Sequence, residues 1–234
     1  MRALCILHDS FSTTGLIGAG LRERGWTVDE VLIVPTEHYH SPNVKFTFPD
    51  HREYDLLVPM GAPWSAYDDE KIGAWLGPEL DWLAEAAESG AAILGICFGA
   101  QALARALGGA VARLAAPEIG WYGIESAEPD LVGPGPWFQW HFDGFTPPPG
   151  AVTVARTEAA AQAYRIGRCL GTQFHPEVTI VDVRMWLHSG GVAEARAHGI
   201  DPEDLVAECE RQAAGARERT ATLLDAYLAT VFAG

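Results

Sequence analysis

Apolar runs and helix-like spacings alternate along the first 110 residues. Four runs read as buried strands, at residues 3–7, 28–34, 55–60 and 91–96. Between them, apolar residues recur every three or four positions, which predicts helices at residues 13–24, 78–89 and 98–107. In the second of these helices, Pro78 suits a position near the start. Strands that alternate with helices in this way are typical of a parallel, doubly wound sheet.

The pattern changes after residue 110, where short strands follow one another. Gly and Pro turns separate predicted strands at residues 119–126, 137–145, 151–155, 163–166 and 169–174. This half of the chain indicates an antiparallel-rich extension. The predicted fold class is therefore α/β. It has a mostly parallel, doubly wound central sheet of the flavodoxin-like kind with helices on both faces, plus a smaller antiparallel extension in the second half.

The end of the chain reads as an amphipathic helix over residues 201–231. Asp201 is a good N-cap, and Pro202 suits the first helical position. The pattern fits one helix or two joined near Gly215, which either cover an edge of their own domain or bind a partner. No linker divides the chain, so we expect a single domain, residues 1–234, with this helix as its C-terminal extension.

Composition restricts the classes of partner. The chain has 234 residues, 48% hydrophobic and 20% charged, as is usual for a soluble globular protein. Its formal net charge of −15 argues against nucleic acid, because a phosphate backbone needs a basic surface. No apolar run approaches the ~18 residues of a membrane span, and the first residues do not read as a signal peptide. We therefore expect a cytoplasmic protein with no nucleic-acid or membrane partner.

Metal-ligand patterns are weak. The four cysteines are scattered without CxxC or similar spacing, which fits a reduced compartment. His38 and His40 lie two residues apart in the polar segment 37–51, but no carboxylate or Cys partner has suitable spacing nearby. We interpret the segment as a solvated loop and expect neither a metal nor a cofactor.

The candidate chemistry centres on Cys97, at the turn between a predicted strand and a predicted helix. Gly95 and Gly99 flank it two residues away on either side, which is the Gly-x-nucleophile-x-Gly elbow with Cys as nucleophile. Glycines are needed because a Cβ there would collide with the neighbouring strand and helix. The helix N-terminus favours the thiolate, and the N–H of Phe98 would point at an oxyanion. The alternative is a small cysteine buried in the core.

Two other stretches could complete such a site. His175 ends a predicted strand and Glu177 follows on the same side of an extended segment, so the carboxylate could orient the imidazole. Gly61 and Ala62 lie on a turn at the same sheet edge as Cys97, where they could supply a second oxyanion N–H. Each stretch alone reads as an ordinary turn. Together with the cysteine elbow they favour a thiol-dependent site.

GICFGAQ, followed 78 residues later by the histidine of QFHPEV, resembles the class I glutamine amidotransferases. The resemblance extends to about Leu187. It implies that Cys97 attacks the γ-carboxamide of glutamine and forms a γ-glutamyl thioester. It further implies that His175 protonates the departing ammonia and then activates water, while Glu177 orients His175.

The same resemblance implies an oxyanion hole. The family uses the N–H after the cysteine, here Phe98, and an N–H from a Gly-Gly-Pro turn, where this chain has Gly61, Ala62 and Pro63. Ala62 replaces a glycine of the family. If the turn requires a positive φ at that position, Ala62 would be strained.

Substrate contacts also follow from the resemblance. Gln101 matches a glutamine that helps to hold the amino-acid end of the substrate. Gly61 is a further candidate for a substrate contact. QWHFDGF falls where the family has its Ser-His-Gly-Asp-like segment, which places Trp140, His141 and Asp143 next to the substrate. Trp140 stands where the family has a small residue, so we expect at most a backbone contact from it. EIGWYGI resembles another family stretch with a Glu-x-Gly core, at Glu118 and Gly120.

Three functions remain open. The chain could hydrolyse glutamine, with ammonia passing to a separate synthetase subunit. It could instead be a γ-glutamyl hydrolase that acts on a substituted γ-glutamyl amide or peptide without ammonia transfer. It could also be a non-catalytic binding module, although the intact cysteine, histidine and glutamate argue against that. Aromatic residues expected near the site would suit a substrate bulkier than glutamine: Trp64, Tyr67, Trp121 and Trp140.

Overall fold

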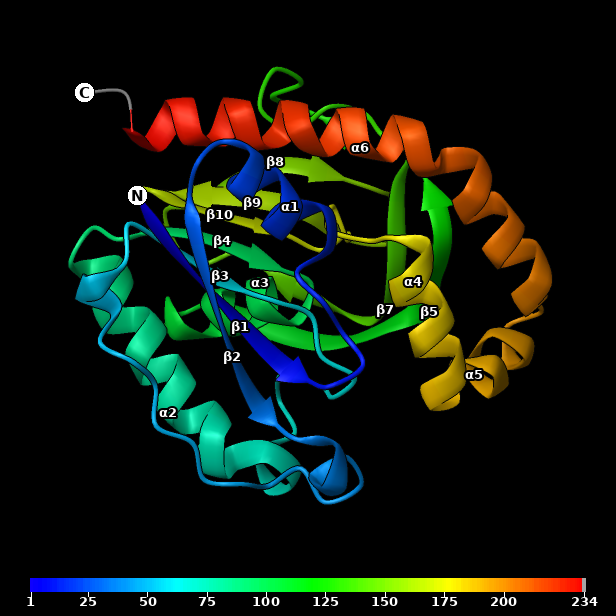
Figure 1. Ribbon diagram of the computed structural model, residues 1–234, viewed down its shortest axis with the longest axis horizontal. Helices are drawn as coiled ribbons and strands as arrows, with labels where there is room; N and C mark the ends of the chain where they lie inside the picture. The colour runs from blue at the N-terminus through cyan, green and yellow to red at the C-terminus, as the bar shows by residue number, and fades with distance from the viewer. Residues whose placement is uncertain (233–234) are drawn as a thin grey trace.

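The computed structural model describes residues 1–232, so residues 233–234 of the predicted domain lie outside it. An eight-stranded sheet has the order β2-β1-β3-β4-β10-β9-β8-β6, and a second sheet pairs β5 with β7 (Figure 1). The strands of the large sheet are β1 (Arg2–Asp9), β2 (Thr27–Val34), β3 (Leu56–Pro59), β4 (Ala92–Ile96), β6 (Glu125–Ser126), β8 (Val152–Arg156), β9 (Ala161–Ile166) and β10 (Cys169–Thr172). The small sheet contains β5 (Ala110–Tyr122) and β7 (Trp137–Thr146).

Three of the α-helices lie between strands along the chain, and the other three follow the last strand. The α-helices are α1 (Gly15–Glu23), α2 (Asp69–Glu88), α3 (Phe98–Ala106), α4 (Ile180–Trp186), α5 (Val192–Ala197) and α6 (Pro202–Phe232). Two 3₁₀ turns, η1 (Thr36–His38) and η2 (His51–Glu53), interrupt the polar segment before β3, and a π-helical turn, η3 (Leu187–Gly191), joins α4 to α5.

The predicted fold class is confirmed. Strands β2, β1, β3, β4 and β10 are parallel, whereas β9, β8 and β6 continue the same sheet in antiparallel order. The extension also includes the separate antiparallel pair β5–β7. Since parallel strands present their carboxyl ends at one edge, β1, β3, β4 and β10 bring four chain segments to a common place.

Helices cover both faces of the large sheet, as predicted. Alternate residues of β1 separate the two sides, since Cys5 packs with the buried residues of α1 and α6, and Ile6 packs with those of α2 and α3. Figure 1 shows α6 in red along one side of the sheet and α2 in cyan-green on the opposite side. The sheet edge where the carboxyl ends of β1, β3, β4 and β10 meet therefore lies between two packed layers of helices.

Two predicted boundaries are wrong. The helix expected at 78–89 begins at Asp69, so Pro78 lies inside it rather than at its start. Pro78 is on the exposed side, where water can satisfy the carbonyl that loses its partner, while the buried residues continue the three-to-four spacing back to Ile72. The strand expected at 119–126 begins at Ala110 and ends at Tyr122, because β5 pairs with β7 along that whole length apart from an irregularity between Arg113 and Glu118.

The C-terminal helix is continuous through Gly215. Its buried side includes Leu205, Cys209 and Leu223, at the spacing that the sequence predicts. Thr220 on this side donates a 2.6 Å hydrogen bond to the carbonyl of Pro176, next to the candidate histidine. In residues 1–232, no helix combines the length and the apolar character that crossing a bilayer would require.

Candidate active site

Cys97 occupies a strained turn between β4 and α3. Its φ is +49° and its ψ is −106°, and it is the one non-glycine residue among residues 1–232 with a positive φ. A Cβ on Gly99 would lie 2.0 Å from the carbonyl oxygen of Pro59, and one on Gly95 would lie 2.9 Å from Cα of Ala100. The two glycines therefore permit the close approach of strand and helix that raises Cys97 above the sheet.

The sulfur of Cys97 contacts a side-chain amide. Nε2 of Gln173 lies 3.6 Å from Sγ, and Oε1 of Gln173 accepts a 3.2 Å bond from Nε2 of Gln101. Gln101 also donates to the backbone carbonyl of Asp143 at 3.2 Å. Gln173 is not among the residues predicted for the site. Its position two residues before His175, on the same side of an extended segment, is the signal that could have found it.

The other three thiols lie in the core. Burial raises the pKa of Cys5 to about 12 and the pKa of Cys169 to about 11. Burial also raises the pKa of Cys209. These thiols remain protonated near neutral pH, so they are poor nucleophiles. Cys97 differs from them because it lines the cavity described below.

His175 and Glu177 form a buried pair directly after β10. Nδ1 of His175 lies 2.7 Å from Oε1 of Glu177, and the backbone N–H of His175 donates to the carbonyl of Phe138 at 2.8 Å. Burial lowers the pKa of His175, but the negative charges of Glu177 and Cys97 outweigh it and leave that pKa well above its usual value. The imidazole is therefore biased towards the protonated form.

The second nitrogen of His175 is available for chemistry. Nε2 is buried and makes no hydrogen bond within residues 1–232, while the ring lines the same cavity as Cys97. Gly61 lies beside both residues, because a Cβ there would be 3.1 Å from Cε1 of His175 and 3.9 Å from Cβ of Cys97. Catalytic contacts are often loose before substrate binds, so this arrangement suits a thiol and base that close on a substrate.

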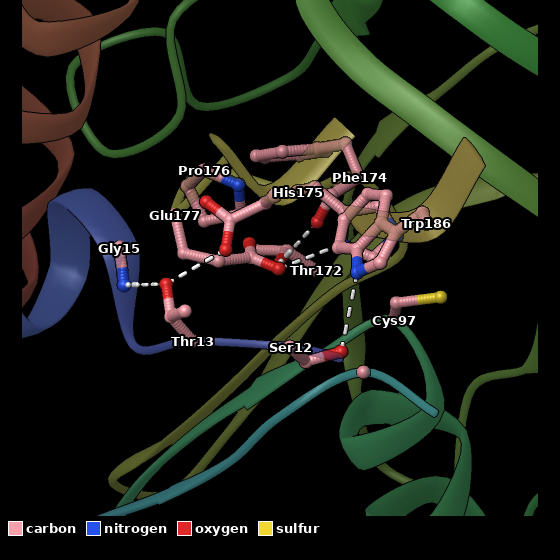
Figure 2. A network of polar contacts seen from close by, with 12 residues as sticks. Ser12, Thr13, Gly15, Cys97, Thr172, Phe174, His175, Pro176, Glu177 and Trp186 are labelled. Carbon is pink, nitrogen blue, oxygen red and sulfur yellow. Dashed lines mark hydrogen bonds and ion pairs between the residues drawn. The ribbon is translucent and has the colours of Figure 1, made fainter. Parts of the chain in front are cut away.

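The loop that leads into α1 holds Glu177 in place. The N–H of Leu16 donates to the carbonyl of Glu177 at 2.7 Å, and a Cβ on Gly15 would lie only 2.0 Å from that oxygen. Gly15 has φ +43°, and its N–H donates to Thr13 Oγ1 at 3.1 Å. Figure 2 shows this loop against the His175–Glu177 segment. Nothing in the sequence around Gly15 indicates this contact, since it depends on packing between distant segments.

The turn after β3 places Gly61 and Ala62 in the cavity wall. Ala62 does not adopt a positive φ, so the replacement of a glycine there costs no backbone strain. Phe98 is the first residue of α3, where the helix itself offers no acceptor for the N–H. Gly61, Ala62 and Phe98 line the cavity with Cys97.

The predicted substrate residues lie in the same region. Gln101, Trp140 and His141 line the cavity. The expectation that Trp140 contacts the substrate at most through its backbone stays a prediction. Its indole packs against Trp186 with ring centroids 6.1 Å apart. Nε1 of Trp140 also lies 3.3 Å from Oε2 of Glu194, so the side chain forms part of the cavity wall.

His141 is hydrogen-bonded at one ring nitrogen and lies close to a carboxylate, without hydrogen-bond geometry, at the other. Nε2 lies 3.1 Å from Oε2 of Glu118 and Nδ1 lies 3.0 Å from the carbonyl of Asp143. Burial raises the pKa of Glu118, but hydrogen bonding and the charge of His141 outweigh this and lower it overall. The Asp143 carboxylate accepts bonds from Ser65 Oγ at 2.6 Å and Tyr67 hydroxyl at 3.1 Å. This network fixes the wall of the cavity on the β5–β7 side.

The cavity has a volume of about 450 Å³. Trp64 and Trp140 line it as expected, but Trp121 and Tyr67 are not among its lining residues in the described chain. Trp121 instead packs on Phe138 with ring centroids 5.5 Å apart. The opposite wall comes from the segment after β10 and includes Trp186, Ser189, Gly190, Gly191, Glu194 and His198. This wall is not predictable from local sequence, because it forms only where residues 186–198 pack against the distant Trp140.

Metal-ligating side chains are not clustered in the described structure. Within residues 1–232, no group of three or more His, Cys, Asp or Glu side chains is placed to hold a metal ion. His38 lies in the turn η1, and His40 lies in the turn that follows it.

A family model described as glutamine amidotransferase class-I matches residues 7–184. A curated relative, GMP synthase [glutamine-hydrolyzing] from Thermus thermophilus, is 38% identical over 136 residues, which is 55% of this chain and 25% of the relative. The chain thus covers about a quarter of that relative's length. A GMP synthase [glutamine-hydrolyzing] subunit from Sulfurisphaera tokodaii is 29% identical over 161 residues, 63% of this chain and 82% of that protein.

Solved structures of glutamine amidotransferases are also similar to this chain. A glutamine amidotransferase from Thermotoga maritima has a TM-score of 0.82 and 30% identity, covering 97% of this chain and 98% of its own. A glutamine amido transferase from Methylobacillus flagellatus has a TM-score of 0.83 at 23% identity, covering 97% and 94%, and shows the fold alone.

Proposed function

The chain belongs to the glutamine amidotransferase class-I family, and we propose that it hydrolyses the γ-carboxamide of glutamine through a γ-glutamyl thioester on Cys97. The observation that carries this proposal is the placement of the Cys97 elbow beside the His175–Glu177 pair, in one cavity. The sulfur, the imidazole and the carboxylate supply a nucleophile, a proton carrier and its orienting group.

The first half of the proposed reaction forms the thioester. The Cys97 thiolate attacks the carboxamide carbon, and the N–H groups of Phe98 and Ala62 stabilise the oxyanion. Nε2 of the protonated His175 then donates its proton to the leaving nitrogen, so that the C–N bond breaks and ammonia departs. The charge of Glu177 keeps the imidazolium available for this step.

The second half returns the enzyme to its starting state. Neutral His175 accepts a proton from water at Nε2 while the water oxygen attacks the thioester carbon. The C–S bond breaks, glutamate departs, and the thiolate of Cys97 and the imidazolium of His175 are regenerated. One water is consumed, and ammonia and glutamate are the products.

Turnover by the purified chain tests this proposal. Glutamate release from glutamine is measured for the wild type and for Cys97→Ser. We expect release by the wild type and a loss of at least ~10⁴-fold in the variant, because the nucleophile and its base act as one unit. Absence of release by the wild type, together with failure of Cys97 to be labelled by an electrophilic glutamine analogue, would instead favour a non-catalytic module.

The ammonia requires a destination. We propose a separate, cytoplasmic synthetase chain as the acceptor, and the similarity to a protein named as one subunit of a GMP synthase supports this arrangement. If a partner is needed, glutamine turnover by the lone chain will be slow and will rise when the synthetase is added. Equal turnover with and without every synthetase in a co-purification screen would contradict this part of the proposal.

A second candidate is hydrolysis of a substituted γ-glutamyl amide without ammonia transfer. The cavity of about 450 Å³ favours it, because this volume lies in the range of sites for drug-sized ligands. Much of the wall beyond the catalytic groups is aromatic, from Trp64, Trp140 and Trp186. A panel of γ-glutamyl amides separates the candidates: higher kcat/KM for bulky amides than for glutamine supports the second, and the reverse order supports the first.

A further inference from the structure

Another buried histidine–glutamate pair, distinct from His175–Glu177 and His141–Glu118, lies behind the cavity wall. His8, near the end of β1, has Nε2 2.9 Å from Oε1 of Glu79, which lies in the middle of α2. Both side chains are completely buried. Neither belongs to the proposed catalytic groups. Burying a carboxylate costs free energy unless it is paired, so the pairing with His8 accounts for the stability of Glu79 in the core. Core packing alone does not explain why two polar side chains lie there.

The other nitrogen of His8 reaches the oxyanion turn. Nδ1 lies 3.1 Å from the carbonyl oxygen of Gly61. A carbonyl can only accept, so Nδ1 carries a hydrogen and donates it. The contact between Nε2 and Glu79 needs a second proton, on either the ring or the carboxyl. Both nitrogens of His8 are therefore committed to contacts.

His8 also contacts the second residue of the proposed oxyanion hole. Its ring packs edge-on against Phe98, with centroids 4.7 Å apart, and lies 5.5 Å from the ring of Trp75. His8 thus touches both Gly61, which precedes one proposed oxyanion donor, and Phe98, which carries the other.

The geometry of a peptide links this contact to catalysis. In a trans peptide the C=O of one residue and the N–H of the next point in opposite directions. A Gly61 carbonyl held towards His8 therefore turns the N–H of Ala62 away from His8. The cavity lies beyond the turn, since Gly61 faces His175 and Cys97 whereas His8 is completely buried.

We propose that His8, held by Glu79, is a positioning residue that fixes the Gly61–Ala62 peptide so that the N–H of Ala62 faces the developing oxyanion. The inference rests on the proposed amide hydrolysis and adds to it a residue pair outside the cavity. Backbone contacts hold the start of the turn, where the N–H of Met60 donates to the carbonyl of Ile6 at 3.1 Å and the carbonyl of Met60 accepts from the N–H of Gly99 at 3.0 Å. The hydrogen bond from His8 fixes the rotation of the next peptide.

The test compares two reactions of the same thiol. Hydrolysis of glutamine passes through an oxyanion, whereas alkylation of Cys97 by iodoacetamide occurs at a saturated carbon and forms none. His8→Phe keeps an aromatic ring but removes both hydrogen bonds. We expect kcat to fall about 10²–10³-fold, as for loss of one oxyanion donor, while the rate of Cys97 alkylation stays within about threefold of wild type.

Two variants provide controls. His8→Asn restores a donor near the position of Nδ1 and should recover at least a tenth of the lost activity. His51→Phe is a matched control, because His51 is also a buried histidine beside α2, with Nε2 3.6 Å from Glu85, but lies outside the cavity lining. We expect it to leave kcat within about twofold. If His8→Phe does not fold, the double variant His8→Phe/Glu79→Met, which leaves no unpaired carboxylate, is measured in its place.

The outcomes separate this inference from the proposed function. Equal losses in hydrolysis and alkylation would overturn the inference, because His8 would then act on the thiol or on the whole fold. If the wild type hydrolyses no glutamine or γ-glutamyl amide, the proposed function fails. The inference is then decided by the crystal structure of His8→Phe: a rotated Gly61–Ala62 peptide supports it, and an unchanged peptide contradicts it.

Discussion

The histidines of two buried histidine–glutamate pairs, His8–Glu79 and His175–Glu177, lie at the ends of parallel strands of the large sheet, and the pairs differ at one ring nitrogen. In His8–Glu79 the contact is 2.9 Å, and the remaining ring nitrogen lies 3.1 Å from the carbonyl of Gly61. In His175–Glu177 the contact is 2.7 Å, and the remaining nitrogen makes no hydrogen bond within residues 1–232. The second pair borders the cavity, and the first lies behind its wall.

This difference shows how a histidine–glutamate pair can either hold a peptide in position or exchange a proton. A ring with both nitrogens bonded cannot give or take a proton without losing a buried contact, so His8 is suited to holding a peptide in place. A ring with one nitrogen bonded keeps its tautomer and orientation, and its other nitrogen can exchange a proton with a thiol or a leaving group. The predictions below test this division.

The histidines themselves give the largest expected contrast. His175→Phe removes the only proton carrier proposed for the reaction, so kcat/KM for glutamine should fall by at least ~10⁴-fold. His8→Phe should cost about 10²–10³-fold. Steady-state glutamate release measures both. A smaller loss in His175→Phe than in His8→Phe would reverse the assignment of the two pairs.

The two glutamates sharpen the comparison. Glu177→Gln removes the negative charge that raises the pKa of His175, so less imidazolium is available, and we expect kcat to fall about 10²–10⁴-fold. Glu79→Gln can still hydrogen-bond Nε2 of His8, so a loss of about tenfold or less is expected. Both variants replace a buried carboxylate by the amide of the same shape, which makes each the control for the other.

The pH dependence of Glu177→Gln has a definite sign. The folded-state pKa of His175 is raised, so its stabilisation is fully present below the unfolded value of about 6.5 and is lost as pH rises through the folded pKa. In the variant the alkaline limb of kcat should therefore move to lower pH. Urea unfolding should show the largest difference between wild type and variant at low pH, narrowing as pH rises. An alkaline limb that does not move would contradict the role of Glu177.

A smaller effect is expected where the α1 loop supports the catalytic pair. Gly15→Ala forces a Cβ to within 2.0 Å of the Glu177 carbonyl at φ +43°, so the loop or Glu177 must shift. We expect a loss of about 10–100-fold in kcat, since misplaced catalytic groups are costly, and a free energy of unfolding lower by about 2–3 kcal/mol.

Gly25→Ala is the matched control for that variant. Gly25 has φ +79° but no atom within 4 Å of the Cβ position. It should lose about 1 kcal/mol of stability and keep its kcat. Equal kcat for Gly15→Ala and Gly25→Ala would show that the position of Glu177 does not depend on the α1 loop.

The two pairs were not equally visible in the sequence. His175 and Glu177 are two residues apart, and Cys97 lies between two glycines, so local spacing was enough to predict that they share a site. His8 and Glu79 are 71 residues apart and sit in a strand and a helix that look like ordinary core elements. Only the packing of α2 against β1 brings them together.

The same distinction applies to the rest of the fold. Alternating buried strands and amphipathic helices predicted the parallel sheet, because each element carries its own period. The start of α2 was misplaced because Pro78 suggested a beginning, whereas the exposed side of the helix accommodates it. The strain that a positive φ would cause at Ala62 does not arise, and the sequence could not show this because φ depends on how the turn joins its neighbours.

The smallest contrast concerns the indoles that pack on the two histidines. Trp186 lies 4.9 Å from the ring of His175, and its Nε1 donates to Ser12 Oγ at 3.2 Å. Trp75 lies 5.5 Å from the ring of His8, and its Nε1 donates to the carbonyl of Pro42 at 2.8 Å. A substitution to Phe removes one hydrogen bond in each case and keeps an aromatic ring.

These two substitutions should separate binding from stability. Trp186 lines the cavity, so Trp186→Phe should change KM by about two- to fivefold and lower the free energy of unfolding by only about 0.5–1.5 kcal/mol. Trp75 is completely buried, so Trp75→Phe should cost about 1–3 kcal/mol for the unpaired carbonyl while KM stays within about twofold. Steady-state kinetics and urea unfolding on both proteins test this. A KM change in Trp75→Phe as large as that in Trp186→Phe would mean that the buried pair influences substrate binding as well as the oxyanion, and the two pairs would then no longer have separate roles.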